Sequence, residues 1–161
     1  MMTDGHKLGM LPVATGFFLV RDEQMLEAIP TERTVIHNLT ATKNGDRAAI
    51  AWATMRHLGR EGYREKVRHL LELRERMVAG IEQIEGMRMA VKPHVTVLNF
   101  TSDIHDVETV HQQMLSRGWG TSYLVHHGIP CIRLSIHPNK KREHVEAFLS
   151  ALEDSAGSAR A

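Results

Sequence analysis

The stretch DGHKLG at residues 4–9 carries the sharpest local signal in the sequence, and an apolar run, GFFLVR at residues 16–21, follows it closely. A lysine forms an imine with an aldehyde only through its neutral amine, and an adjacent imidazole with flanking glycines suits a tight turn around a phosphorylated cofactor. Taken alone the motif is weak, because lysine is almost always exposed to solvent. Lys7 is therefore a candidate whose weight depends on the rest of the sequence.

The segment that follows the motif is predicted to contain little regular structure. The run at 16–21 suits a buried strand, and a short helix is expected over residues 23–29, before Pro30. Residues 31–46 mix threonine, asparagine, glycine and charge without a period, which indicates an ordered loop. Loops of this kind often carry functional residues.

Two helices are predicted next, and they differ in where their apolar residues lie. Residues 47–58 are apolar nearly all round, as in a helix buried on every side, and a pair of glycines then breaks or bends it. Residues 63–84 carry an apolar stripe on one side, with Gly86 as the expected stop. Trp52 and Tyr63 are interpreted most simply as core residues.

The C-terminal half alternates strands with helices. Strands are predicted near 95–101 and 131–137, the second with isoleucine and leucine facing one way and Arg133 the other. An amphipathic helix lies between them and another follows, while the Ser/Gly/Ala-rich residues 155–161 predict a disordered tail. This order predicts a small α+β or α/β sandwich with its helices on one face.

Composition and charge exclude several classes of function. The chain has 161 residues, 42% of them hydrophobic, which suits one globular unit with a real core. A formal charge of +1 gives no reason to expect nucleic acid or an anionic membrane as partner. One cysteine and the absence of a long apolar run predict a cytoplasmic protein. The eleven histidines show no metal-ligand spacing, so no metal site is expected.

Four blocks of sequence, in the same order, resemble the group II pyridoxal phosphate (PLP) dependent decarboxylases. They are similar to the microbial tyrosine/aspartate decarboxylases and the related sphingoid-phosphate lyases. The blocks are DGHK with its apolar run at 4–21, AWA with LGREGY at 51–63, RGW at 117–119, and the last strand and helix at 130–149. Any one block is weak evidence, whereas four in register cover roughly the whole chain.

The resemblance implies a fold, a cofactor and a reaction. The fold is α/β, the C-terminal portion of a PLP-dependent transferase-like (fold type I) enzyme that ends in the small α+β sandwich. Lys7 is implied to be the imine-forming catalytic lysine, with His6 beside the cofactor phosphate. PLP acts as an electron sink while carbon dioxide leaves the α-carbon of an amino-acid substrate. The family is dimeric as a rule.

One loop departs from the family pattern. TKNG at residues 42–45 stands where the family has a Gly-Ser/Thr-Arg-x-Gly loop that reaches the phosphate across a dimer interface, which makes Thr42 a candidate cofactor-binding residue. Ala41 replaces the glycine and Lys43 the arginine, and lysine keeps the charge but loses the bidentate fork. A polar loop leading into a helix is an equally good interpretation. Arg133 is either a solvated strand-face residue, the favoured interpretation, or a contact for a substrate carboxylate.

The expected organisation leaves the enzyme incomplete. Residues 1–46 would end the large PLP-binding domain, 47–86 would be linking helices, 87–154 the small domain and 155–161 the tail. The acidic partner of the pyridine nitrogen and the phosphate-cradling loop come, in the family, mostly from the region before the lysine. Only six residues precede Lys7 in this sequence. The chain alone is therefore expected to be inactive.

Three accounts of such a chain remain open. It is half of a split enzyme that assembles with an N-terminal PLP-domain piece, an inactive remnant, or a remnant reused as a non-catalytic interaction module. Within enzymes, the nearest alternative to decarboxylation is carbon–carbon cleavage of a phosphorylated amino alcohol, as in sphingoid-phosphate lyases. The two share the lysine chemistry and differ in the substrate pocket.

Overall fold

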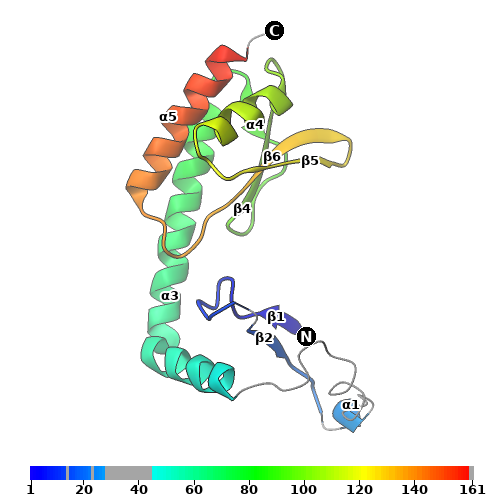
Figure 1. Ribbon diagram of the computed structural model, residues 1–161, viewed down its shortest axis with the longest axis vertical. Helices are drawn as coiled ribbons and strands as arrows, with labels where there is room; N and C mark the ends of the chain where they lie inside the picture. Colours follow the sequence, from blue (N-terminus) through cyan, green and yellow to red (C-terminus); the bar gives the residue numbers. More distant parts are fainter. Residues whose placement is uncertain (14, 23, 28–44, 160–161) are drawn as a thin grey trace. The chain divides into compact units, whose positions relative to one another are not determined.

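The computed structural model describes residues 1–13, 15–22, 24–27 and 45–159, and the chain forms two compact units, Met1–Tyr63 and Arg64–Ala161 (Figure 1). The division falls inside a long helix, between the boundaries after residues 46 and 86 that the sequence suggests. Within the described ranges, no helix combines the length and the apolar character needed to cross a bilayer.

The first unit is built on a small antiparallel pair of strands. Strand β1 (Met2–Asp4) pairs with β2 (Gly16–Phe18), with Asp4 opposite Gly16. The strand expected at 16–21 is thus present but shorter, and the helix expected at 23–29 is α1 (Gln24–Glu27). Residues 5–9, which follow β1, form a turn that contains Lys7.

Helix α3 (Asp46–Gln83) runs through both units and is interrupted at Gly59, whose φ of 57° and ψ of −172° are not helical. The predicted break between two helices is therefore confirmed. The segment before the break is not buried in this chain: Trp52 is 68% exposed and Ile50 40%, although Ala51 is buried. The expectation that Trp52 is a core residue is wrong. An apolar helix surface indicates that the helix is covered, but the covering surface need not belong to the same chain.

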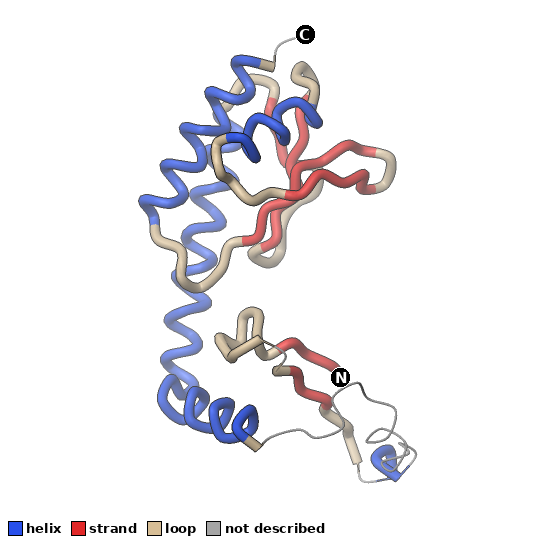
Figure 2. Tube along the Cα trace, viewed as in Figure 1, coloured by secondary structure: helices blue, strands red, loops and turns tan. Residues whose placement is uncertain are grey.

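The second unit is a four-stranded antiparallel sheet with three helices against it (Figure 2). The strand order is β3-β4-β6-β5, from β3 (Met87–Met89), β4 (Val97–Ser102), β5 (Ser122–His126) and β6 (Ile129–Ser135). The helices are the second part of α3, α4 (Val107–Ser116) and α5 (Arg142–Ser158). The small α+β sandwich predicted from the sequence matches this arrangement.

A single core joins the helices to the inner face of the sheet. Its largest fully buried members are Phe100, Phe148, Ile81, Leu98, Met114, Ile132, Leu152, Val110 and Val145. Along β6, Ile132 is fully buried while Arg133 is exposed, which confirms the predicted alternation. Cys131 lies in the same strand with no exposed surface, its Sγ donates to the Ile129 carbonyl oxygen at 3.2 Å, and burial raises the pKa of the thiol.

The end of the chain is more ordered than its composition suggests. Helix α5 continues to Ser158, and Ser155 and Ala156 are buried. The Ser155 hydroxyl donates to the Ala151 carbonyl oxygen at 2.7 Å and so satisfies its own polarity inside the helix. The predicted disordered tail is therefore wrong for residues 155–158, because small residues in this segment allow close packing.

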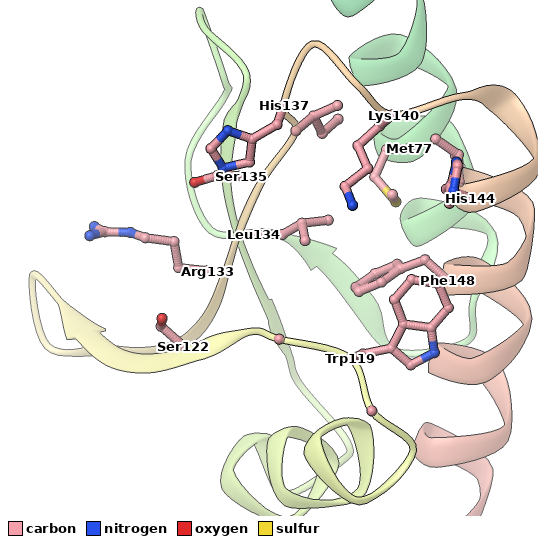
Figure 3. A pocket seen from close by; sticks show the side chains of 14 residues that line it. Met77, Trp119, Ser122, Arg133, Leu134, Ser135, His137, Lys140, His144 and Phe148 are labelled. Atoms are coloured by element: carbon pink, nitrogen blue, oxygen red, sulfur yellow. The ribbon is translucent and has the colours of Figure 1, made fainter. Parts of the chain in front are cut away.

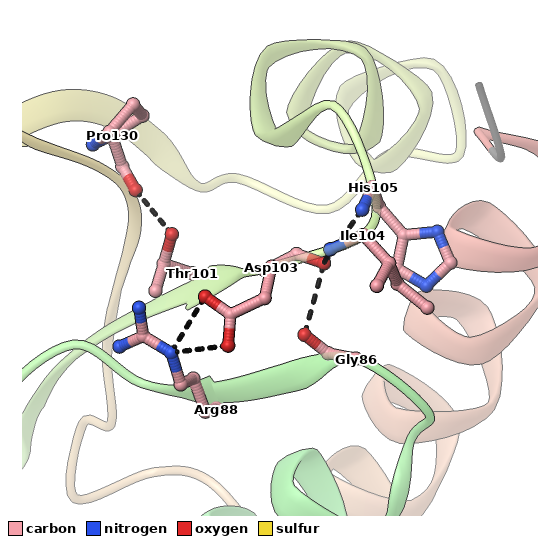
Figure 4. A network of polar contacts seen from close by, with 8 residues as sticks. Gly86, Arg88, Thr101, Asp103, Ile104, His105 and Pro130 are labelled. Atoms are coloured by element: carbon pink, nitrogen blue, oxygen red, sulfur yellow. Dashed lines mark hydrogen bonds and ion pairs between the residues drawn. The ribbon is translucent and has the colours of Figure 1, made fainter.

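The loop between α3 and the sheet is held by a polar network (Figure 4). The Ser102 hydroxyl donates to the Gly86 carbonyl oxygen at 3.0 Å and accepts the backbone N–H of His105 at 2.9 Å. The Arg88 Nε bonds both carboxylate oxygens of Asp103, at 3.0 and 2.8 Å. These contacts fix the start of β3 against the end of β4.

Gly86 is expected to tolerate substitution poorly. Its φ is 77°, and a Cβ there would run into the Ile104 side chain. Gly86→Ala should therefore lower the free energy of unfolding by about 1–3 kcal/mol, from left-handed strain and overpacking. Chemical denaturation of the variant measures the loss. Gly120→Ala, at a position with open space and no left-handed φ, is the control and should change little.

The Arg88–Asp103 pair predicts a dependence of stability on pH. The hydrogen bond from Arg88 holds the pKa of Asp103 below its usual range. The folded pKa is thus lower than the unfolded one, so the stabilisation is present above the unfolded pKa, about 3.9, and is lost as the pH falls through the folded pKa. Asp103→Asn should be less stable than wild type at pH 7 and equally stable near pH 2, as measured by urea unfolding at both pH values. A constant difference would contradict this origin.

Candidate functional site

The turn that carries Lys7 is fixed by backbone hydrogen bonds. The Lys7 N–H donates to the Asp4 carbonyl oxygen at 3.2 Å, and the Lys7 carbonyl oxygen accepts the N–H of Met10 at 3.2 Å. Across the turn, the Leu11 N–H donates to the Gly5 carbonyl oxygen at 3.1 Å. The position of the lysine backbone is therefore set by its own loop.

The Lys7 side chain is accessible and forms an ion pair with Asp4. Its Nζ lies 2.7 Å from the Asp4 carboxylate, and the two side chains are 65% and 49% exposed. The hydrogen bond from Lys7 lowers the pKa of Asp4. Because water competes for both groups, this pair is easily exchanged for another partner of the amine.

His6 lies against the base of the turn in a defined orientation. Its backbone N–H and its ring Nδ1 both lie 3.1 Å from the Thr15 carbonyl oxygen. A carbonyl only accepts, so Nδ1 carries the proton and Nε2 of the neutral ring is left as the acceptor. The Thr15 Oγ1 beside it is buried and has no hydrogen-bond partner among the described residues.

Close packing inside the turn depends on one small residue. A Cβ on Gly9 would lie 2.5 Å from the Gly5 carbonyl oxygen, so only glycine fits there. The Tyr63 hydroxyl donates to the Gly9 carbonyl oxygen at 3.0 Å, and the Arg47 guanidinium donates to the Val13 carbonyl oxygen. Tyr63 is thus a buttress of the lysine turn, a role that its interpretation as a core residue does not include.

The described residues fit the attachment end of PLP. They supply one accessible primary amine, Lys7, an adjacent imidazole with a free acceptor, and an unpartnered buried hydroxyl on Thr15. The loop with Thr42, the other candidate cofactor-binding residue, lies outside the described residues. Within the described ranges, no three His, Cys, Asp or Glu side chains are grouped as metal ligands would be.

Arg133 belongs to the second unit, on the outer face of β6. Its Nε donates to the Asn99 side-chain oxygen at 3.0 Å, across the β4–β6 pair. The side chain is exposed, as the favoured interpretation of the sequence expects. A substrate contact for it stays a prediction.

Comparison with known proteins shows what this chain is similar to. The sequence is 32% identical to the probable L-aspartate decarboxylase of Thermococcus gammatolerans over 158 residues, which are 94% of this chain and 40% of that protein. It is also 32% identical to the sphingosine-1-phosphate lyase of Oryza sativa subsp. japonica, over 99% of this chain and 30% of that protein. No protein-family model matches the sequence.

The fold comparison agrees. The solved sphingosine-1-phosphate lyase of Burkholderia pseudomallei has a TM-score of 0.84 and 28% identity, covering 99% of this chain and 37% of that chain. The glutamate decarboxylase domain of a Vibrio parahaemolyticus enzyme has a TM-score of 0.76 and 21% identity, which shows the fold alone. The chain thus has the fold of about a third of a fold type I PLP-dependent enzyme.

Over that partial length, the chain is similar to L-aspartate and L-tyrosine/L-aspartate decarboxylases and to a sphingosine-1-phosphate lyase, which confirms the resemblance carried by the four sequence blocks. The chain spans 40% of the length of the Thermococcus gammatolerans protein and 30% of that of the Oryza sativa lyase. The activity of the whole protein is therefore a matter of proposal.

Proposed function

We propose that this chain supplies the cofactor-attaching lysine of a PLP-dependent amino-acid decarboxylase. The observation that carries the proposal is Lys7, an accessible amine on a turn fixed by its own backbone, in a chain related to L-aspartate decarboxylases. A rigid turn with a reachable amine is what a covalent attachment point needs. The turn packing of Gly9 and Tyr63 serves the same purpose.

Each residue of the turn has a role in this proposal. Lys7 would hold the cofactor through its Nζ once that atom is released from Asp4, and the same atom would hold or return a proton. Asp4 keeps the free amine in place, since its carboxylate is the described partner of Nζ. His6 presents Nε2 as an acceptor beside the cofactor. The bound PLP supplies an electron sink for the loss of carbon dioxide.

The remaining parts of the cofactor site are proposed to come from the region of the relatives that lies outside the part matched by this chain. The N-terminal part of α3 is the surface we assign to it, because Ile50, Trp52 and Met55 are large apolar side chains that are exposed there. Large exposed apolar side chains gathered on one helix mark a contact surface. The part of the fold that contacts this surface of α3 would be supplied by the same polypeptide, by a separate polypeptide, or by a second copy in a cytoplasmic dimer.

A second candidate reaction has specific support. The Oryza sativa and Burkholderia pseudomallei matches are sphingosine-1-phosphate lyases, and the latter covers 99% of this chain at a TM-score of 0.84. Cleavage of a carbon–carbon bond in a phosphorylated amino alcohol would use Lys7 in the same way. Turnover of an amino acid and of a phosphorylated amino alcohol by the complete enzyme separates the two.

The test of the proposal is covalent trapping. The chain is mixed with PLP, first alone and then together with a polypeptide that supplies the rest of the enzyme fold. Each mixture is reduced with borohydride and mapped by peptide mass spectrometry. A label on Lys7 supports the cofactor role, and a label that requires the rest of the fold supports a split or longer enzyme. A label on other lysines only, or none even with the complete fold present, contradicts the role and favours a non-catalytic interaction module.

A further inference from the structure

The second unit contains a pocket of about 460 Å³ between the end of β6, the turn before α5 and the start of α5 itself (Figure 3). All of its lining residues belong to the unit Arg64–Ala161. Such a volume suits a small organic molecule. The Lys7 turn belongs to the other unit, so the pocket requires its own explanation.

The pocket forms where β6 loses its neighbour. Strand β5 pairs with β6 only as far as Ser122 opposite Arg133, and the sheet is open beside the residues that follow. The Ile136 N–H donates to the Thr96 carbonyl oxygen at 2.9 Å, on the β4 side. Because backbone groups alternate along a strand, the N–H of Ser135 points to the open side. A backbone donor thus faces the pocket that Ser135 lines.

Lys140 is held so that its ammonium reaches the middle of this pocket. Its N–H donates to the His137 carbonyl oxygen at 3.0 Å, and its own carbonyl oxygen lies 3.0 Å from Nε2 of His69 on α3. With the backbone fixed at both ends, the side chain extends towards Leu134 and Phe148 (Figure 3). In the part of the chain that the structure describes, no carboxylate forms an ion pair with Lys140.

His144 adds a second donor, in a defined tautomer. Its Nδ1 accepts the backbone N–H of Lys141 at 3.1 Å, at the start of α5. In the neutral ring the proton is therefore on Nε2, which is left to donate. The start of α5 also carries the positive end of the helix dipole.

The wall opposite these donors is aromatic, and none of the described residues that line the pocket is acidic. The Trp119 and Phe148 rings meet edge to face, with centroids 5.3 Å apart and an interplanar angle of 86°. Of the nearby carboxylates, Glu146 is already paired with Arg76 and Arg142. The pocket therefore joins a cationic side to an apolar side.

From this arrangement we infer a binding site for an organic carboxylate with a small aromatic or branched aliphatic body. The carboxylate meets Lys140, with His144 and the Ser135 N–H as further donors, and the apolar body packs on Trp119. One ammonium and neutral N–H donors match a singly charged carboxylate, whereas a phosphate dianion calls for more charge than they provide. Arg133 also lines the pocket, but its Nε is bonded to Asn99 and its side chain points away from Lys140, so we assign the carboxylate to Lys140 (Figure 3).

The experiment uses Trp119 as its own reporter. The chain has two tryptophans, so Trp52→Phe leaves Trp119 as the single fluorophore. In this background, titration with phenylacetate is expected to change the fluorescence saturably. Benzyl alcohol, without the charge, and phenyl phosphate, with a doubly charged group, should bind at least about tenfold more weakly.

The decisive comparison is between two adjacent lysines. Lys140→Gln should weaken phenylacetate binding about tenfold, the effect of losing one charge-assisted hydrogen bond. Lys141→Gln removes the same charge one residue away, outside the lining, and should leave binding within about twofold. Equal losses in both variants, no saturable signal, equal binding of benzyl alcohol, or tighter binding of phenyl phosphate would each overturn the assignment. Urea unfolding of both variants verifies that the fold is unchanged.

Discussion

Replacing Lys7 with alanine in the complete enzyme is expected to lower kcat by roughly 10³-fold or more and to abolish covalent attachment of PLP. The reason is chemical, because no other group in the turn is a primary amine that can form the bond and later return a proton. Lys7→Arg keeps the positive charge without a usable nucleophile and should be equally inactive. Activity assays with borohydride trapping measure both effects.

Replacing Lys7 should leave the stability of the fold nearly unchanged. Lys7 is 65% exposed and the turn is held by backbone bonds, so the free energy of unfolding should change by less than about 0.5 kcal/mol. Lys92→Ala, at another exposed lysine, is the matched control and should retain both activity and PLP binding. Full activity of Lys7→Ala in the assembled protein would rule out the assigned role.

Replacing Phe148 with alanine should be the most damaging change to the second unit. The side chain is 1% exposed and its ring contacts two others edge to face, Phe100 at 6.4 Å and Trp119 at 5.3 Å between centroids. Removing it leaves a cavity between α5 and the sheet, at an expected loss of about 3–5 kcal/mol.

The measurement must report on the second unit, since the two units need not unfold together. Trp119 fluorescence in the Trp52→Phe background, followed through a urea titration, does so. Val125→Ala, at an edge-strand position that is 60% exposed, should change the midpoint little. A loss below about 1 kcal/mol for Phe148→Ala would mean that the site collapses around the missing ring.

Much of this fold is predictable because the signals are local. The alternation along β6 fixes Ile132 inside and Arg133 outside without reference to the rest of the chain. The break at Gly59 follows from a glycine where a long apolar helix changes its pattern. Strands β3 and β5 are not predicted, since β3 has only three residues and the β5–β6 turn uses His127, whose φ of 49° is unusual for that residue type.

In the candidate site, too, the residues that lie close together in the sequence were predicted, and those that only the fold brings together were not. Lys7 and His6 are adjacent in the sequence and form a weak motif when taken alone, and the resemblance carried by the four sequence blocks is what singles them out. Tyr63, which braces the turn at Gly9, lies 54 residues away along the chain, and only the fold brings the two together. The pocket around Lys140 is likewise lined by a strand end, a turn and two helices, so no spacing of residues in the sequence predicts it.

Burial is the least reliable inference, for a physical reason. An apolar pattern measures how much a segment gains by leaving water, whichever surface covers it. The apolar pattern predicts that Trp52 is buried, whereas the described residues of this chain leave it exposed. From Ser155 onward the composition predicts a disordered tail, although Ser155 is buried and its hydroxyl is hydrogen-bonded within its own helix.

The buried thiol of Cys131 makes the protein convenient for site-specific spectroscopy. It is the only cysteine, it has no exposed surface, and burial holds its pKa above the usual range, so alkylating reagents find little thiolate. A single cysteine introduced at an exposed position such as Val125 could then carry a fluorophore or spin label, with Cys131 left in place. Distances from such labels would measure how the two units are arranged in solution.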